Sequence, residues 1–391
     1  MLDSDGRSVP ADRQDDARRR LKVLHLILML GETNGQYNEH CLPLIGERDL
    51  SISTYFVPRL TPPPEITMFA GDGTLRGFFR SLHRALDAER YDVIHAHAPQ
   101  SGVLLLLAVL ARRRSHRLRR SLVYTVQDSF YDYRLRDQAM MVVPLVTFHR
   151  VIFCSGSAYE SLPRVLKWLV RGRWRVVQNG ADIDRVDRAI AAASVDRPID
   201  REDGRFTVLS VGRLDSVKDP FVVLDAFARL VDRDDDGRLV FIGGGRLATA
   251  LEARVDRTGL QGRVTLRGLI PREQVFLASA EADVFVSTSR GEGLPVAVLE
   301  AMAAGCPVIL SDIPPHRELA EDAGFIPFVT PGDVEGFAKE IKRYRAMTSD
   351  ERREIGRRCR AHVSARFTLP IMRAGTDAVY METARPAASH P

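Results

Sequence analysis

Hydrophobic and polar positions follow a regular rhythm along this chain. Short runs of apolar and β-branched residues are separated by roughly 10–20 residues in which apolar positions recur at helical spacing. Runs that are apolar throughout are typical of parallel strands covered by helices on both faces. The first series of expected strands lies at 22–30, 50–57, 91–96, 122–126, 151–154 and 175–178, and the second lies at 206–211, 239–242, 263–267, 283–287, 307–310 and 325–329.

Two such series predict two doubly wound, Rossmann-like α/β domains. Open parallel sheets bind ligands beyond the carboxyl ends of their strands, so we expect the site in a cleft between two facing domains. The expected division is a disordered tail at 1–20, a first domain at 21–186, a linker without strand pattern at 187–204, a second domain at 205–365, a C-terminal helix at 366–383 that packs back on the first domain, and a tail at 384–391.

Composition narrows the possible partners. The 391 residues include 56 Lys and Arg against 51 Asp and Glu, a net charge of +5. This excess is too small for a nucleic-acid-binding protein, so we expect no nucleic acid partner, but it suits a phosphate-bearing ligand or an anionic membrane. Four scattered cysteines without a Cys-x-x-Cys pair indicate a reducing, cytoplasmic location, and the longest apolar run, 103–111, is too short to span a bilayer.

The densest group of chemically informative residues lies at 287–305. A strand is expected to end near Ser287, a glycine-flanked loop carries Glu292, and a helix is expected from about Pro295 to Gly305. Free amides at the start of a helix bind anions, and the helix dipole strengthens that binding. The amides expected to contribute are those of Gly293, Leu294 and Val296.

Glu292 and Glu300 lie eight residues apart, one in the loop and one in the helix. Carboxylates accept hydrogen bonds from sugar and ribose hydroxyls, so two of them beside an anion site suit a sugar-bearing phosphate. The alternative is that Glu292 caps the helix and Glu300 is a solvated helix residue.

This segment resembles the Glu-x7-Glu motif of the family 4 retaining glycosyltransferases, which have the GT-B fold. The resemblance continues through the residues after Glu300 and covers roughly residues 21–380. Further matches, in the order of the family, lie at 91–97, 179–182, 211–218 and 241–245.

The resemblance implies roles for individual residues. Arg213 and Lys218 would hold the diphosphate of a nucleotide sugar, since a planar fork and a mobile point charge suit two phosphates. Glu300 would hold ribose hydroxyls, Glu292 would hold hydroxyls of the donor sugar, and His97 would orient the transferred sugar or the acceptor. It also implies retention of anomeric configuration without a covalent enzyme nucleophile, and no metal ion or other cofactor besides the donor.

The acceptor side departs from the family pattern. The family commonly has a histidine where this chain has Gln127, and a glutamine bonds a hydroxyl but cannot titrate. Asp128 is a further acceptor-side candidate. His97 retains the alternative of a buried histidine with satisfied hydrogen bonds.

Three glycines are candidates for close approach to the donor. Gly31 and Gly35 follow the first strand, where small residues let the backbone approach a phosphate, although turn geometry alone also explains them. Gly243 belongs to the matching strand-to-glycine turn and is expected to support the nucleotide site.

We therefore predict a glycosyltransferase, specifically a hexosyltransferase, that uses a nucleotide diphosphate sugar, with a UDP-sugar favoured, and a hydroxyl acceptor. A lipid-linked acceptor is one candidate. The resemblance favours bacterial surface polysaccharide or glycoconjugate synthesis. The alternatives are glycosylation of a secondary metabolite, a GT-B epimerase or phosphorylase, a Rossmann dehydrogenase and a non-catalytic membrane scaffold.

Two basic segments, 112–120 and 161–175 with Trp168, predict peripheral contact with the inner face of the plasma membrane or, alternatively, solvated helix ends. The acidic string at 232–236 resembles a metal-binding Asp-x-Asp, but its place between a helix and a strand favours a solvated turn.

Overall fold

The computed structural model describes residues 20–31, 34–112, 115–196, 205–230 and 237–384. Five sequence expectations lie wholly or partly outside these residues: the tail at 1–20, the basic segment at 112–120, the end of the linker, the acidic string at 232–236 and the tail at 384–391.

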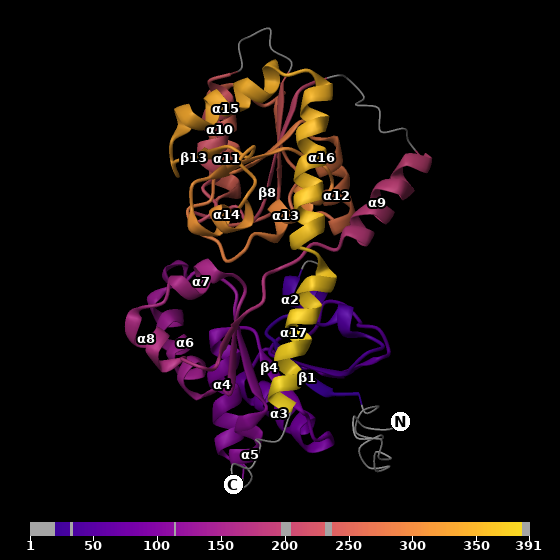
Figure 1. Cartoon of the computed structure of the whole chain (residues 1–391), viewed down its shortest axis with the longest axis vertical. Coiled ribbons are helices and arrows are strands. Elements are labelled where there is room, and N and C mark those ends of the chain that lie inside the picture. Colours follow the sequence, from indigo (N-terminus) through magenta and orange to yellow (C-terminus); the bar gives the residue numbers. More distant parts are fainter. Residues whose placement is uncertain (1–19, 32–33, 113–114, 197–204, 231–236, 385–391) are drawn as a thin grey trace, which may run out of the picture. The chain divides into compact units, whose positions relative to one another are not determined.

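The first sheet contains seven strands in the order β3-β2-β1-β4-β5-β6-β7. Figure 1 labels its neighbouring strands β1 and β4. Neighbouring strands pair in parallel in β1–β2, β1–β4, β2–β3, β4–β5 and β6–β7, which agrees with the apolar character of the runs. The sequence pattern did not predict β3. This strand has only four residues, comes shortly after three consecutive prolines, and buries only two of its side chains. The strands are β1 (Lys22–Ile27), β2 (Asp49–Thr54), β3 (Ile66–Phe69), β4 (Val93–Ala96), β5 (Leu122–Val126), β6 (Arg150–Phe153) and β7 (Trp174–Val176).

Helices connect these strands. Thr74 caps α3, where its hydroxyl accepts a hydrogen bond from the amide of Gly77. The helices are α2 (Gly35–His40), η1 (Leu42–Leu44), α3 (Leu75–Ala88), α4 (Pro99–Leu110), α5 (Ser115–Arg120), η2 (Phe130–Asp132), α6 (Leu135–Thr147), α7 (Gly156–Glu160), α8 (Arg164–Leu169) and α9 (Ile183–Asp196).

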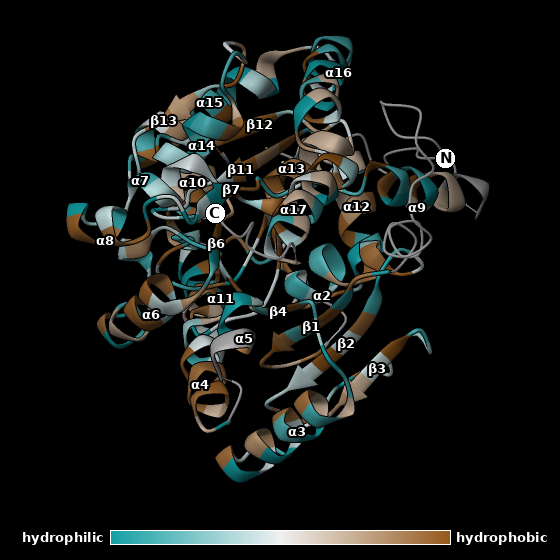
Figure 2. Cartoon of the chain, turned by 60° about the horizontal axis from the view of Figure 1, so that its bottom comes forward, coloured by the Kyte–Doolittle hydropathy of each residue, from teal (hydrophilic) through white to brown (hydrophobic). Residues whose placement is uncertain are grey.

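The second sheet contains six strands in the order β10-β9-β8-β11-β12-β13. Alternate residues enter different cores: Phe285 packs in one apolar cluster, while Val284 and Val286 pack in the other. Both faces are therefore buried, and the apolar positions of β11, β12 and α13 are visible in Figure 2. The strands are β8 (Thr207–Val211), β9 (Arg238–Ile242), β10 (Val264–Leu266), β11 (Val284–Ser287), β12 (Val308–Ser311) and β13 (Phe328–Val329).

The helices around this sheet end in a long helical segment. Thr348 and Glu351 form a capping box at the start of α16, and Phe367 ends that helix. The backbone of Ala181 pairs on both sides of Thr368, so the chain leaves helical geometry there before α17 begins. The helices are α10 (Pro220–Ala228), α11 (Ala248–Thr258), α12 (Arg272–Glu281), α13 (Val296–Ala303), α14 (Pro314–Leu319), α15 (Val334–Ala346), α16 (Ser349–Arg366) and α17 (Leu369–Ala384).

By contact, the described residues form two compact units. The first contains the chain up to Tyr124, Thr147–Arg150 and the chain from Ala378, and the second contains Thr125–Val146 and Val151–Asp377. Part of the expected linker, residues 187–196, belongs to α9. Among the described residues, no helix combines the length and the hydropathy that a membrane span requires.

Candidate active site

Arg213 and Lys218 lie in the loop between β8 and α10, in the second unit. Asp215 organises this loop, because its carboxylate accepts hydrogen bonds from the amides of Val217 and Lys218 at 3.1 and 3.2 Å. The guanidinium of Arg213 lies 3.4 Å from the same carboxylate and is 72 % exposed. The loop thus presents one exposed and one largely buried cation.

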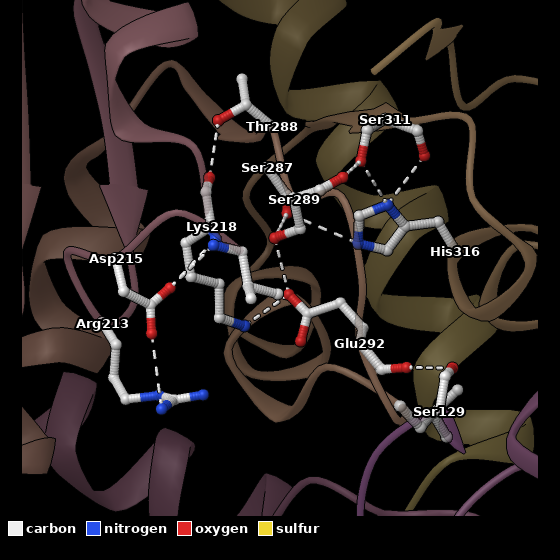
Figure 3. A network of polar contacts seen from close by, with 12 residues as sticks. Ser129, Arg213, Asp215, Lys218, Ser287, Thr288, Ser289, Glu292, Ser311 and His316 are labelled. Atoms are coloured by element: carbon white, nitrogen blue, oxygen red, sulfur yellow. Dashed lines mark hydrogen bonds and ion pairs between the residues drawn. The ribbon is translucent and has the colours of Figure 1, made fainter. Parts of the chain in front are cut away.

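Lys218 forms a buried ion pair with Glu292, which follows β11 (Figure 3). The hydroxyl of Ser289 donates a second hydrogen bond to the same carboxylate at 2.7 Å. Burial alone raises the pKa of Glu292, but the charge of Lys218 and these hydrogen bonds hold it below its usual value. Glu292 is therefore an ionised acceptor at neutral pH.

The buried His316 is connected to this pair through serine hydroxyls. His316 contacts Ser311 through Nδ1 and lies 3.4 Å from the hydroxyl of Ser287 through Nε2. Ser287 in turn lies 3.2 Å from Ser289, so the contacts continue to Glu292 (Figure 3). Burial lowers the pKa of His316, so the ring is a neutral hydrogen-bonding support.

The backbone after Glu292 is held at three consecutive carbonyls. Ser129 donates to the carbonyl of Glu292 at 2.8 Å, and Ser155 donates to that of Gly293 at 2.8 Å. Asn179 donates to the carbonyl of Leu294 at 2.9 Å. These three donors follow β5, β6 and β7 in turn, so they fix the direction of the peptide units that carry the predicted anion-binding amides.

Close packing requires glycine at one position of this loop. A Cβ on Gly293 would collide with the backbone carbonyl of Gln127 and with Cys154. Glycine permits the close approach of the backbone there. A Cβ on Gly291 would meet only the carboxylate of Asp132, which would have to move.

The structure buries Glu300 in α13 and pairs it with Arg272, whose Nε lies 2.6 Å from Oε1. The alternative of a solvated helix residue is therefore wrong, because the helix face that carries Glu300 packs inward. Burial raises the pKa of Glu300 although Arg272 opposes that shift. The expected helix start is one residue early, since Pro295 is the N-cap and α13 begins at Val296.

Gly243 supports the loop that carries the cations. Its φ of +136° and a Cβ that would meet the carbonyl of Gly212 both require glycine. Gly245 packs in the same way against the carbonyl of Leu214. The observed role of this turn is thus to support the backbone next to Arg213.

Gln127 and Asp128 follow β5 in the second unit. The carbonyl of Gln127 accepts from the thiol of Cys154 at 3.2 Å. Burial and the nearby charge of Glu292 raise the pKa of Asp128, whereas Lys218 and Arg213 lower it. Asp128 therefore belongs to the same electrostatic environment as Glu292.

His97 lies in the first unit, directly after β4, within a group of four buried histidines. Its Nε2 lies 2.9 Å from Nδ1 of His25. His95 Nδ1 lies 2.6 Å from the hydroxyl of Tyr380, and the ring of His40 lies 4.9 Å from that of His97. The expected strand at 91–96 and the observed β4 both end at Ala96, so His97 is the first residue after the strand.

Burial makes this histidine cluster neutral. It lowers the pKa of His25 to about 3 and that of His40 to about 4, and it lowers those of His95 and His97 well below the usual value. The ring nitrogens of His25, His95 and His97 lie within 4.8 Å of one another, so these residues are candidate metal ligands.

The glycines near β1 show no steric requirement of this kind. A Cβ on Gly31 would meet open space, and one on Gly35 would touch only the flexible end of Glu39. The carbonyl of Gly31 accepts from the amide of Asn34, which caps α2.

Comparison with known proteins identifies the chain. The family described as "Glycosyl transferases group 1" matches residues 194–362, and that described as "Glycosyltransferase Family 4" matches residues 46–185. The chain belongs to the family 4 glycosyltransferases.

Relatives of this glycosyltransferase include enzymes named for diphosphate-linked lipid acceptors. The UDP-Gal:alpha-D-GlcNAc-diphosphoundecaprenol alpha-1,3-galactosyltransferase of Escherichia coli is 24 % identical over 312 residues, which is 77 % of each chain. The GDP-mannose:cellobiosyl-diphosphopolyprenol alpha-mannosyltransferase of Xanthomonas oryzae pv. oryzae is 30 % identical over 207 residues, 52 % of this chain and 51 % of the relative.

Solved structures confirm the predicted GT-B fold of the glycosyltransferase. Sucrose-phosphate synthase from Thermosynechococcus elongatus matches with a TM-score of 0.76 and 20 % identity, covering 93 % of this chain and 99 % of that one. HepE of Anabaena, in complex with UDP and glucose, matches with a TM-score of 0.73 and 19 % identity, covering 93 % and 100 %.

Several polar residues of the glycosyltransferase were not predicted from its sequence. One signal was available, because Ser129, Ser155 and Asn179 each lie shortly after an apolar strand, where ligand-binding loops are expected. Arg272 and His316 carry no comparable signal, since each reaches its carboxylate or serine partners only through packing of helices on the sheet.

Proposed function

We propose that this enzyme transfers a hexose with retention of configuration from a nucleotide diphosphate sugar to a hydroxyl of a lipid-linked acceptor in bacterial glycoconjugate synthesis. The observation that carries the proposal is the buried pair of Lys218 and Glu292, with Arg213 beside it, at the carboxyl ends of β8 and β11. A small cavity of about 20 Å³ adjoins Arg213, Lys218 and Ser289.

In the proposed reaction, Arg213 and Lys218 bind the diphosphate, and the amides of Gly293, Leu294 and Val296 add hydrogen bonds. Glu292 accepts hydrogen bonds from hydroxyls of the donor sugar, and Glu300 accepts them from the ribose. At Gly31, Gly35 and Gly243 the absence of a side chain lets the protein backbone lie close to the donor. These side chains supply the positive charge and the acceptors, so the proposal needs no metal ion or further cofactor.

The bond between the anomeric carbon and the phosphate oxygen breaks, and its electron pair remains on the diphosphate. The acceptor oxygen bonds to the anomeric carbon from the same face, and its proton passes to the departing diphosphate. His97, Gln127 and Asp128 orient the sugar and the acceptor hydroxyl. Arg213 and Lys218 stabilise the negative charge that develops on the diphosphate, because both cations are already in place before the bond breaks.

The names of known relatives support the choice of donor and acceptor. The Escherichia coli relative is named for UDP-galactose and a diphosphoundecaprenol acceptor, and HepE was solved with UDP. The Xanthomonas relative is named for GDP-mannose. We therefore propose a UDP-sugar first and a GDP-sugar as the second choice.

A thermal-shift panel of UDP- and GDP-sugars tests the donor. A ligand that binds only the folded state stabilises it by RT ln(1 + [L]/Kd), or about 2.7 kcal/mol at 100 times Kd. The donor that stabilises the protein most is then supplied in labelled form with lipid-linked saccharides. An epimerised donor, or release of sugar that requires phosphate, would support an epimerase or a phosphorylase instead.

The proposal also includes peripheral contact with the inner face of the plasma membrane. On α8, Val165 and Trp168 are 68 % and 70 % exposed, with the exposed Arg164 and Arg171 nearby in the chain. Apolar and cationic side chains on one surface segment suit an anionic bilayer. The second basic segment, 112–120, lies partly outside the described residues.

Sedimentation with phosphatidylglycerol vesicles tests this contact, with phosphatidylcholine vesicles as the reference. Trp168→Ala should reduce the fraction bound to anionic vesicles several-fold. Leu75→Ala, which truncates an exposed apolar residue of α3, serves as the control. Equal binding to both lipids would contradict the proposal.

A further inference from the structure

A cavity of about 360 Å³ lies in the second unit, beside the loop that carries Glu292. Gly291 of that loop lines it. Four segments form it, and each follows a strand: the loop after β5 with Tyr131 and Asp132, the start of α7 with Ser157, Gly291 after β11, and Pro314 after β12. Its volume is within the range of roughly 300–1,000 Å³ that small-molecule sites occupy.

Asp132 connects this cavity with the proposed donor site. Its carboxylate packs against Gly291, directly before Glu292, and lines the cavity. The oxygen Oδ2 is buried and has no hydrogen-bond partner. An unsatisfied buried carboxylate oxygen is costly, so a hydroxyl bound here would supply a hydrogen bond that the protein does not provide. Rotation about the Cβ–Cγ bond of Asp132 exchanges the positions of Oδ1 and Oδ2, so either oxygen can accept the hydrogen bond.

Charges of the proposed donor site shift the pKa of Asp132. Burial, Asp128 and Glu292 raise its pKa to about 6, while Lys218 lowers it. At neutral pH the carboxylate is still mainly ionised and therefore accepts hydrogen bonds from hydroxyl groups.

The remaining walls are suited to the apolar face of a sugar ring. Tyr131 is 68 % exposed beside the cavity, and Ile313, Pro314 and Pro315 add apolar surface. The hydroxyls of Ser129 and Ser161 are already bonded within the protein, to the carbonyls of Glu292 and Ala158. Two charged residues also line the cavity: Glu160, which is paired with Lys167, and Arg290, which is paired with Asp219. The cavity thus combines apolar walls with a few polar groups, as sites that fix the orientation of a ligand do.

We propose that this cavity binds the terminal sugar ring of the acceptor and that Asp132 accepts a hydrogen bond from a hydroxyl of that ring other than the one that is glycosylated. The inference rests on the proposed transferase function. It adds a binding residue, Asp132, and a place for the acceptor sugar, which neither the family comparisons nor the sequence motifs assign.

The test measures donor and acceptor steps separately. The donor is the nucleotide sugar that most stabilises the wild type, and the acceptor probes are octyl glycosides of glucose, galactose, mannose and N-acetylglucosamine. We expect the wild type to glycosylate at least one of them. Asp132→Asn should keep donor Kd and slow donor hydrolysis within about twofold, but lower kcat/KM for that glycoside about 10- to 100-fold, the loss of one hydrogen bond to a charged group.

Tyr131→Ala is the second variant, because it truncates an exposed ring and does not threaten folding. It should raise KM for the glycoside while leaving donor Kd unchanged. Asp137→Asn changes an acid of the next helix that does not line the cavity, and it should behave as the wild type.

The inference is wrong if no glycoside is glycosylated, if both variants leave kcat/KM for the glycoside unchanged, or if donor binding falls as much as transfer. Failure of the proposed function has a different signature. In that case no nucleotide sugar stabilises or is hydrolysed by the wild type.

Discussion

Two buried polar clusters in this glycosyltransferase meet the cost of burial in opposite ways. In the second unit, Glu292 retains its charge because Lys218 and Ser289 contact its carboxylate. In the first unit, burial keeps His25 and His97 uncharged, and the two rings share a hydrogen bond. A buried group thus remains charged where an opposite charge compensates desolvation, and becomes neutral where none does.

The difference separates two kinds of chemistry. In the proposed reaction, the lysine–glutamate pair provides a positive charge for the diphosphate and an acceptor for sugar hydroxyls. The histidine cluster provides hydrogen bonds in a neutral environment, and the bond between His25 and His97 ties the tautomer of one ring to that of the other. We therefore expect the two clusters to respond differently to substitution and to pH.

The largest effect should come from Lys218→Ala. The substitution leaves Glu292 as a buried charge without its cation, which typically costs about 3–5 kcal/mol, and it removes a ligand of the diphosphate. We expect kcat/KM to fall about 100- to 1,000-fold, with a lower urea midpoint. Lys339→Ala removes an exposed lysine of α15 and should leave both unchanged. Full activity of Lys218→Ala would contradict the assignment of the site.

The second prediction concerns acid stability. The histidines of the cluster have depressed folded-state pKa values, so their stabilising contribution is complete above the unfolded value of 6.5 and is lost as the pH falls toward about 3–4. Each histidine contributes a slope of up to about 1.4 kcal/mol per pH unit.

His25→Leu should therefore flatten the fall of the unfolding free energy by about 1 kcal/mol between pH 6.5 and 5.5. Urea titrations at these two pH values measure the difference. The leucine also removes the hydrogen bond to His97, so the variant starts from a lower stability at pH 7. An unchanged slope would mean that His25 is protonated in the folded protein.

The third prediction tests whether His97 acts through hydrogen bonding alone. His97→Asn preserves a donor and an acceptor but cannot serve as a titrating group. We expect a loss of about 10-fold in kcat with donor Kd unchanged, because the shorter asparagine side chain misplaces one hydrogen bond. A loss above about 1,000-fold would instead indicate a proton-transfer role.

The smallest expected effect is that of Ser155→Ala. The substitution removes the bond to the carbonyl of Gly293 and the cap of α7, at a cost of about 1–2 kcal/mol. The donor Kd should rise a few-fold, because the neighbouring amides are less firmly oriented. Ser279→Ala removes a buried serine that bonds only within α12, and it should leave donor Kd unchanged.

Both doubly wound sheets could be predicted from the spacing of apolar runs, because a buried parallel strand is apolar along its whole length. Strand β3 could not, since its four residues carry too little pattern. Glu292, Lys218 and Arg213 could be predicted as site residues because each lies in a loop directly after a strand and within a short motif that resembles the family.

The partners of those residues depend on the tertiary structure. His25 and His95 lie 70 residues apart and meet because β1 and β4 pair in that register. Glu300 and Arg272 meet where α12 packs near α13, and Ser129, Ser155 and Asn179 reach the loop at 292–294 from three different strands. Local spacing encodes strands, turns and motifs, whereas contacts between distant segments follow from strand register and helix packing, which no short stretch of residues specifies.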